Sequence, residues 1–257
     1  MEAAEKLQVF FNRKVKEYNH PSFIESDPIC IPHLFSTKQD IEIAGFFAAI
    51  FAWGNRRTII NKSLELMQLM EMQPYTFCLH ASDDALKSLL HFKHRTFNAT
   101  DLLYCIAFFK QHYQQYDSLE YAFLPNQKNA DSIKAALTYF HHYFFSLEDA
   151  PLRTRKHIST PEKGSSCKRL NMFLRWMVRR DNKGVDFGIW TKIKPSQLIC
   201  PIDVHVARVA KRFSLLERTQ TDWLAAEELT NYLKKLDPKD PAKYDFALFG
   251  LGVIEKY

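Results

Sequence analysis

The chain has 257 residues, of which 46% are hydrophobic and 25% charged, with a formal net charge of +6 at pH 7. This length allows one large or two modest domains with a packed core, and the mild positive charge is compatible with a polyanionic partner without requiring one. The 7 glycines argue against Gly-rich nucleotide loops and a turn-rich all-β fold, whereas the 21 phenylalanines indicate an aromatic core.

Hydrophobic periodicity predicts helices along most of the chain. The first, residues 3–18, is amphipathic, and three prolines predict an extended connector over residues 20–35. Residues 40–53 are apolar nearly all round, so this helix is expected to be buried. Further helices are expected over residues 58–70, 74–90 (two short ones), 102–116, about 129–145, 170–177, 204–213, 222–236 and from 241 onward. The basic and aromatic connector 91–98 is either strand-like or irregular.

The expected class is therefore all-α, with ten to twelve helices and no internal repeat. Five scattered cysteines form no Cys-x-x-Cys pair, and several stand in apolar runs, which predicts buried free thiols in a reducing compartment. No signal peptide, transmembrane run or lipidation motif is visible, so we expect a cytoplasmic protein with no membrane partner. Histidines and cysteines do not stand at zinc-ligand spacing, and neither a metal nor a cofactor is expected.

Lys168, near the start of a predicted helix, is a candidate catalytic residue. Ser165 or Ser166 is a good N-cap, which puts Lys168 in the first helical turn, beside Arg169. The positive end of the helix dipole and the neighbouring arginine both disfavour the protonated amine and should lower its pKa. A neutral lysine is the nucleophile of enzymes that form Schiff bases. The alternative is an ordinary solvated lysine at a basic helix start.

Asp203 is a second candidate catalytic residue, and it occupies the N-cap position before the predicted helix 204–213. Apolar side chains follow on one face of that helix, while His205 and two arginines fall on another. The alternative role of Asp203 is that of a cap and nothing more.

The sequence Pro-Ile-Asp-Val-His-Val-Ala-Arg-Val at residues 201–209 resembles the Val-Asp-(Thr/Val)-His-Val-x-Arg-(Val/Ile) signature of the helix-hairpin-helix DNA glycosylase superfamily. The resemblance covers roughly residues 40–253 and implies that Asp203 is catalytic. In bifunctional members a lysine at the start of the preceding helix attacks the sugar, and Lys168 occupies that place. Lys168 and Asp203 are 35 positions apart, and this long spacing is most similar to that of the archaeal 8-oxoguanine glycosylase branch. The whole chain also resembles a bacterial family of similar length with no assigned function.

The same resemblance implies further contacts with DNA. Asn55 matches the residue that fills the gap left by an extruded base, with Arg56 and Arg57 near the backbone. Ser165, Ser166, Arg169 and His205 are the other expected DNA-binding residues. Trp190, Asp245 and Phe249 are expected to form the pocket for the base. The alternatives are solvated arginines, a core position for Trp190, and a cap or core role for Asp245 and Phe249.

One segment departs from the superfamily pattern. Residues 160–166 read Thr-Pro-Glu-Lys-Gly-Ser-Ser where a Leu-Pro-Gly-Val-Gly hairpin normally offers backbone N–H groups to a phosphate. A Gly-Ser-Ser helix start can still do this. From Arg153 to Lys183 the sequence has ten Lys or Arg residues and two acidic ones, Glu162 and Asp181. This excess of positive charge indicates either a phosphate-binding surface or a solvated basic helix face.

The resemblance implies one helical domain of two subdomains with a cleft, residues 40–150 and residues 1–39 with 151–257, the second carrying the Lys168 and Asp203 site. The expected function is that of a monomeric, nucleoid-associated base-excision DNA glycosylase with lyase activity, acting on an oxidised purine such as 8-oxoguanine in damaged duplex DNA. A catalytically inactive helical nucleic-acid-binding protein is the main alternative, and a protein-interaction scaffold is a third.

Overall fold

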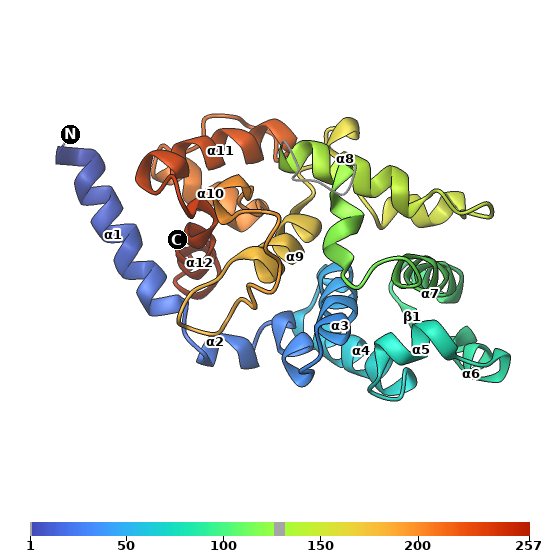
Figure 1. Cartoon of the computed structure of the whole chain (residues 1–257). Helices are drawn as coiled ribbons and strands as arrows, with labels where there is room; N and C mark the ends of the chain where they lie inside the picture. Colours follow the sequence, from blue (N-terminus) through green and yellow to red (C-terminus); the bar gives the residue numbers. More distant parts are fainter. Residues whose placement is uncertain (1, 126–131) are drawn as a thin grey trace. The chain divides into compact units, whose positions relative to one another are not determined.

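The computed structural model describes residues 2–125 and 132–257, and helices make up most of them (Figure 1). The expected all-α class is confirmed. Contacts between residues divide the chain into unit 1 (Met1–Glu25 and Thr160–Tyr257) and unit 2 (Ser26–Ser159). These boundaries lie at residues 25 and 159, whereas the expected ones lay near 39 and 150. No helix within the described residues is both long enough and apolar enough to cross a membrane.

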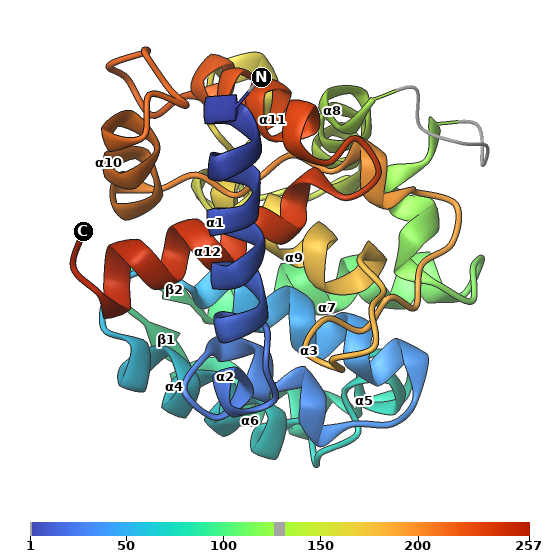
Figure 2. The same cartoon turned by 90° about the vertical axis from the view of Figure 1, so that its left-hand side faces the viewer.

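Unit 1 pairs the N-terminal helix with the C-terminal part of the chain. Its elements are α1 (Glu2–Tyr18), α2 (Ser22–Glu25), η7 (Pro161–Lys163), α9 (Lys168–Val178), η8 (Pro195–Gln197), α10 (Val204–Arg212), α11 (Trp223–Leu236), η9 (Pro241–Lys243), α12 (Tyr244–Phe249) and the π-helical turn η10 (Gly250–Ile254). Helix α1 crosses α12 (Figure 2). The crossing is close at Gly250, where an added Cβ would lie 2.2 Å from the Tyr18 ring. Only a residue without a side chain fits there.

Unit 2 is built around the buried helix α3, as expected from its apolar sequence. Its elements are η1 (Pro28–Cys30), η2 (Pro32–Leu34), α3 (Lys38–Phe51), α4 (Arg56–Leu69), α5 (Pro74–His80), α6 (Asp83–Ser88), η3 (Leu89–His91), β1 (Lys93–His94), β2 (Phe97–Asn98), α7 (Ala99–Tyr113), η4 (Leu119–Phe123), α8 (Ile133–Phe144) and η6 (Leu152–Lys156). Phe46 of α3 contacts the rings of Phe109, Phe140 and Phe144, which confirms the aromatic core. The first residues of the helix expected from 129 lie outside the described residues.

The expected extended connector at residues 20–35 is wrong. This segment folds into α2, η1 and η2, three short helical turns. The Asp27 carboxylate accepts a hydrogen bond from the N–H of Ile29 (3.1 Å), and Pro28 and Pro32 each begin a turn. A proline is suited to that position because its φ is already helical and its missing N–H would have no helical partner.

All five cysteines lie in the described part of the chain and are free thiols, as expected. Cys78, Cys105, Cys167 and Cys200 are buried, and Cys30 is half-buried. Burial raises the pKa of the Cys30 thiol to about 11.

His112 makes the stability of unit 2 depend on pH. Its ring on α7 is buried, with Nε2 2.9 Å from the carbonyl oxygen of Ser118 and Nδ1 3.2 Å from the Tyr143 hydroxyl. Burial lowers the pKa of His112 from 6.5 to about 4. The unfolded chain therefore binds the proton first as pH falls, so this contribution is complete above pH 6.5 and is lost toward pH 4.

We expect acidification from pH 7 to 5 to reduce the free energy of unfolding through His112 by about 2 kcal/mol. His112→Gln removes the titrating group, so this variant should lose less stability over the same interval. Urea unfolding of both proteins at pH 7 and pH 5 measures the difference, in which the contributions of other titrating groups cancel. Equal losses in the two proteins would contradict the assignment.

Candidate active site

Lys168 is the first residue of α9, in the first helical turn, where the sequence places it. The expected cap is wrong, however, because Cys167 takes the N-cap position with a left-handed φ of 50°. The Ser165 hydroxyl instead accepts the N–H of Cys167 (3.1 Å), and the Cys167 thiol donates to the Ser165 carbonyl oxygen. Ser165 also forms a β-bridge with Asp222, which holds the segment extended before the helix. Ser166 is half-buried, and its carbonyl oxygen accepts a hydrogen bond from the Asn171 side chain.

Asp203 is the N-cap of α10, as the sequence predicts. Its Oδ1 accepts hydrogen bonds from the backbone N–H groups of His205 (2.9 Å) and Val206 (3.0 Å). Its Oδ2 lies 3.5 Å from Nζ of Lys168. The fold of unit 1 thus brings together two side chains that are 35 residues apart, with 28% of the lysine and 23% of the aspartate side chain exposed. The pair is reachable from solvent and partly shielded from it.

The helix that begins with Lys168 also carries a buried ion pair, which was not predicted from the sequence. Arg175, on α9 two turns after Lys168, bonds to the carboxylate of Asp245 on α12 and lies 3.3 Å from Asp186. Burial raises the pKa of Asp245 to about 6, against the opposing effects of the Arg175 and Lys168 charges, while the Asp203 charge raises it further. The charges of Lys168 and Asp203 therefore both act on the Asp245 carboxyl. The sequence signal for this contact was an arginine in the interior of a largely apolar helix.

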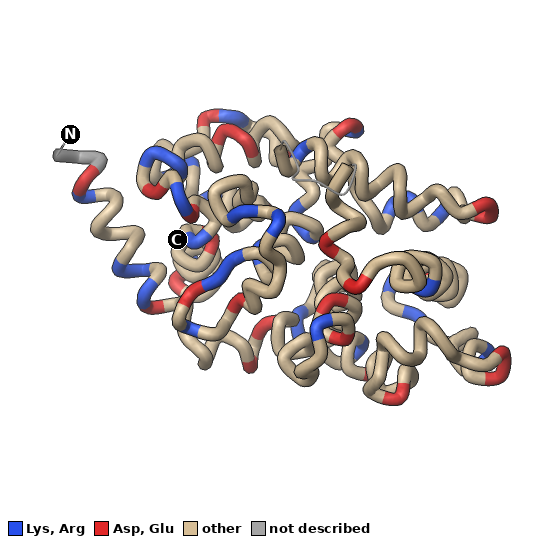
Figure 3. The backbone as a smooth tube through the Cα atoms, in the orientation of Figure 1, with Lys and Arg blue, Asp and Glu red and all other residues tan. Residues whose placement is uncertain are grey.

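The loop between α9 and α10 is fixed to α9 by a second arginine. Nη1 of Arg179 lies 2.7 Å from Asp181 and 3.0 Å from Asp186, and its Nε lies 2.9 Å from Asp240 before α12. Charged residues of both signs follow one another along this stretch (Figure 3). The backbone N–H of Trp190 also donates to the carbonyl oxygen of Met177 (2.9 Å). The long connection between Lys168 and Asp203 is thus packed against the helix that carries the lysine.

The three residues expected to form a base pocket differ from one another in burial and in contacts. The Trp190 ring is 2% exposed and packs edge-on against Phe173, so it is a core side chain. Phe249 is half-buried at the end of α12, where it contacts the edge of Phe23. Asp245 lies one turn before Phe249 on the same helix.

The remaining predicted DNA contacts vary in exposure. His205 is exposed on the first turn of α10, while Arg169 is half-buried and burial lowers its pKa. In unit 2, Asn55 and Arg57 are exposed and Arg56 is half-buried at the start of α4. Oδ1 of Asn55 accepts the N–H of Thr58 (3.2 Å), so Asn55 is the cap of that helix. This cap role does not prevent its amide nitrogen from meeting a ligand.

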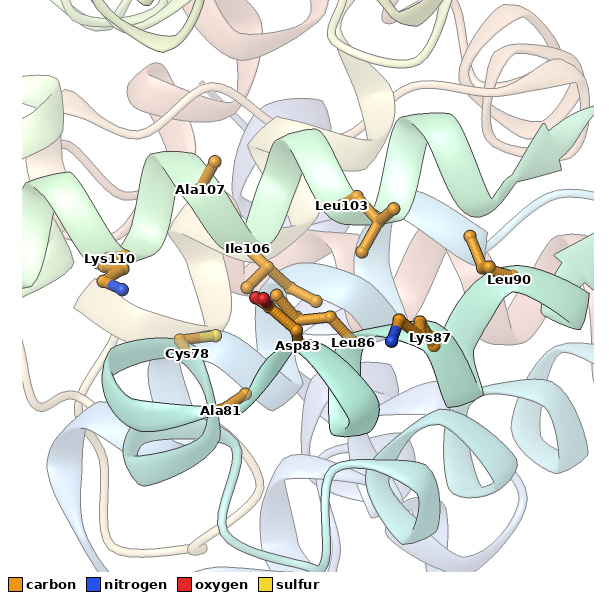
Figure 4. Close-up of a pocket in the computed structure, with 10 residues that line it drawn as sticks. All are labelled: Cys78, Ala81, Asp83, Leu86, Lys87, Leu90, Leu103, Ile106, Ala107 and Lys110. Atoms are coloured by element: carbon orange, nitrogen blue, oxygen red, sulfur yellow. The ribbon is translucent and has the colours of Figure 1, made fainter.

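Unit 2 contains an apolar cavity of about 440 Å³ between α6 and α7 (Figure 4). Its walls are Cys78, Ala81, Asp83, Leu86, Lys87, Leu90, Leu103, Ile106, Ala107 and Lys110. The predicted site residues lie on other elements. Among the residues that the structure describes, no group of three or more His, Cys, Asp or Glu side chains is placed to hold a metal ion.

The model of a family described as a protein of unknown function (DUF2400) matches residues 27–254, which covers both Lys168 and Asp203. No curated protein matches the chain, and no solved structure matches it.

Proposed function

The chain belongs to the DUF2400 family of unknown function, and we propose that it is a base-excision DNA glycosylase with lyase activity. The observation that carries the proposal is the Lys168–Asp203 pair, a lysine amine 3.5 Å from a carboxylate at the starts of two helices. The resemblance of residues 201–209 to the helix-hairpin-helix glycosylase signature adds to it. The protein would act on damaged duplex DNA at the nucleoid.

The geometry of Asp203 suits a charge-stabilising role. Two backbone N–H groups hold one carboxylate oxygen, so the other has a fixed direction toward Lys168. A fixed carboxylate stabilises positive charge that develops on the sugar as the base departs. Oδ2 is also placed to take the proton that Lys168 must lose before it can attack, directly or through one water.

In the proposed reaction, the neutral amine of Lys168 attacks C1′ of the damaged nucleotide. A bond forms between Nζ and C1′, and the bond from C1′ to the base breaks, with the electron pair leaving on the base, which is then protonated. Opening of the sugar ring gives a Schiff base between lysine and sugar. Loss of a C2′ proton then expels the 3′ phosphate by β-elimination, which cuts the strand, and water releases the lysine.

Other residues would bind the substrate. The start of α9 presents backbone N–H groups, which suit phosphates. Ser165, Ser166 and Arg169 lie beside that start, and His205 on the first turn of α10 would add a further contact. Asn55 would fill the duplex gap, with Arg56 and Arg57 on the backbone. Asp245 and Phe249 on α12 would contact an oxidised purine such as 8-oxoguanine. Trp190 packs against Phe173 in the core of unit 1.

Borohydride trapping tests this function. The protein is incubated with labelled duplexes that carry 8-oxoguanine or an abasic site, and the mixture is reduced. A covalent adduct on the damaged duplex, absent from the undamaged one, is the expected result. The absence of an adduct on both lesions would contradict Schiff-base chemistry.

Asp203→Asn separates the catalytic role of Asp203 from its cap role. Asparagine caps helices as well as aspartate does, so the fold should lose little stability. The variant lacks the negative charge, so we expect base release to slow by about a hundredfold or more. Single-turnover base release and thermal unfolding measure the two effects. A normal rate would leave Asp203 as a helix cap only.

One observation favours a second function, that of a nucleic-acid-binding protein without catalysis. The Pro-Gly hairpin of the superfamily is replaced here by residues 160–166, whose end is held by the hydrogen bond from the N–H of Cys167 to the Ser165 hydroxyl. Such a protein would still bind DNA, with an affinity that falls steeply with salt. DNA binding without trapping on either lesion would select this alternative.

A further inference from the structure

The hairpin β1–β2 of unit 2 has one buried side and one charged side. Phe92, His94 and Phe97 are at most 3% exposed, and the Phe97 and His94 rings contact Phe51 of α3. Lys93 and Arg95, which alternate with these residues, are exposed. The hairpin is therefore anchored by its aromatic side and presents cations to solvent.

Arg95, at the hairpin turn, contacts the short segment between α3 and α4, residues 52–55. This segment is called the Asn55 corner below. Its guanidinium lies 5.0 Å from the centre of the Trp53 ring. A Cβ added to Gly54 would lie 2.1 Å from Nη1 of Arg95, so the guanidinium fills the space above that glycine. Arg95 and Asn55 thus belong to one continuous surface of unit 2.

A third cation is bonded directly to the hairpin. Arg153 of η6 donates to the carbonyl oxygen of Thr96 (3.1 Å) and bonds to Asn98, and it pairs with Asp101 at 3.0 Å. The Arg153 side chain is 37% exposed, whereas that of Asp101 is 0% exposed. The carboxylate that fixes Arg153 is therefore hidden from an external ligand, while the cation remains accessible.

We propose that Lys93, Arg95 and Arg153 form a hairpin clamp that binds the phosphate backbone of duplex DNA beside the Asn55 corner. Arg95 is held against Trp53 and Arg153 against the hairpin carbonyl of Thr96. Cations held in this way suit a polyanion, because binding releases counterions without first ordering these two long side chains. The proposal rests on the DNA contact of the proposed function and adds a second contact outside the Lys168 site. Its ligand is the backbone, so binding is independent of base damage and sequence.

The test measures the salt dependence of binding to an undamaged, fluorescein-labelled duplex of 20 base pairs. In the double variant Lys93→Gln/Arg95→Asn, asparagine is chosen because it tolerates the left-handed φ of 55° at position 95. We expect the slope of log Kd against log salt to become shallower by about two, with a several-fold weaker Kd at low salt. Lys110→Gln/Lys134→Gln, which removes two exposed charges from α7 and α8, is the matched control and should keep the slope.

Equal slopes in the hairpin variant and the native protein, with a normal thermal melt, would overturn the clamp. An equal change in both double variants would overturn it too, because only net charge would then matter. Trapping on damaged duplexes provides a separate readout. Trapping with an unchanged hairpin slope would reject the clamp and keep the glycosylase, whereas a changed slope without trapping would keep the clamp and reject the glycosylase.

Discussion

Lys168→Ala is expected to abolish the borohydride-trapped adduct and to slow base release by about a thousandfold or more. The substitution removes the amine that would attack the sugar. Because the lysine side chain is 28% exposed and its ion pair is partly solvated, the fold should lose little stability. Trapping on an 8-oxoguanine duplex measures the first effect, and thermal unfolding measures the second.

Lys163→Ala is the matched control for this experiment. Lys163 ends the turn η7, is exposed, and lies in the same basic segment. It should retain the adduct, which would show that this exposed amine is not the one that is trapped. An adduct that survives in Lys168→Ala would place the nucleophile on another residue. Full activity without any adduct would indicate a glycosylase that uses water instead of lysine.

Arg175→Met is expected to lower the stability of unit 1 by about 3–5 kcal/mol at pH 7. The guanidinium is the charge partner of Asp245 and of Asp186, and its side chain is only 4% exposed. Its loss leaves the Asp245 carboxylate buried without its counter-charge, and methionine does not supply one. Urea unfolding followed by tryptophan fluorescence measures the change, with Trp176 of α9 as a buried reporter.

The pH dependence of the Arg175→Met effect identifies its cause. Burial already raises the pKa of Asp245 to about 6, and removal of the arginine raises it further, because the arginine opposes this shift. At pH 5 the carboxyl of the variant is therefore largely neutral, and the loss of stability should be smaller than at pH 7. The double variant Arg175→Met/Asp245→Leu should likewise lose less free energy of unfolding than the summed losses of the two single variants. Additive losses that do not change with pH would instead indicate lost packing.

This ion pair explains how a distant element supports the candidate site. Arg175 connects α9, which begins with Lys168, to α12. The turn after α12 in turn connects to α10, because Arg208 donates to the carbonyl oxygen of Gly252 (2.7 Å). A Cβ on Gly252 would lie 3.1 Å from the carbonyl oxygen of His205, so the two segments are in close contact. The position of Lys168 relative to Asp203 thus depends on the C-terminal elements.

Local patterns in the sequence were sufficient for the long helices, although they missed the short helical turns of residues 22–34. The apolar residues predicted the buried α3 and the helix α9, because side chains three and four residues apart share a helix face whatever surrounds them. The cap role of Asp203 was also predictable, since it needs only the N–H groups of the next three residues.

The tertiary structure decided which side chains meet. It placed Lys168 3.5 Å from Asp203, buried Arg175 with Asp245, and put Trp190 in the core. It also replaced the expected serine cap of α9 with Cys167, because Ser165 is engaged by a bridge to Asp222, which comes much later in the chain. Periodicity reports only neighbours along a helix, whereas each of these contacts joins segments that are distant in sequence. The sequence by itself thus determined the long helices and the cap of α10, and packing between distant segments determined the geometry of the site.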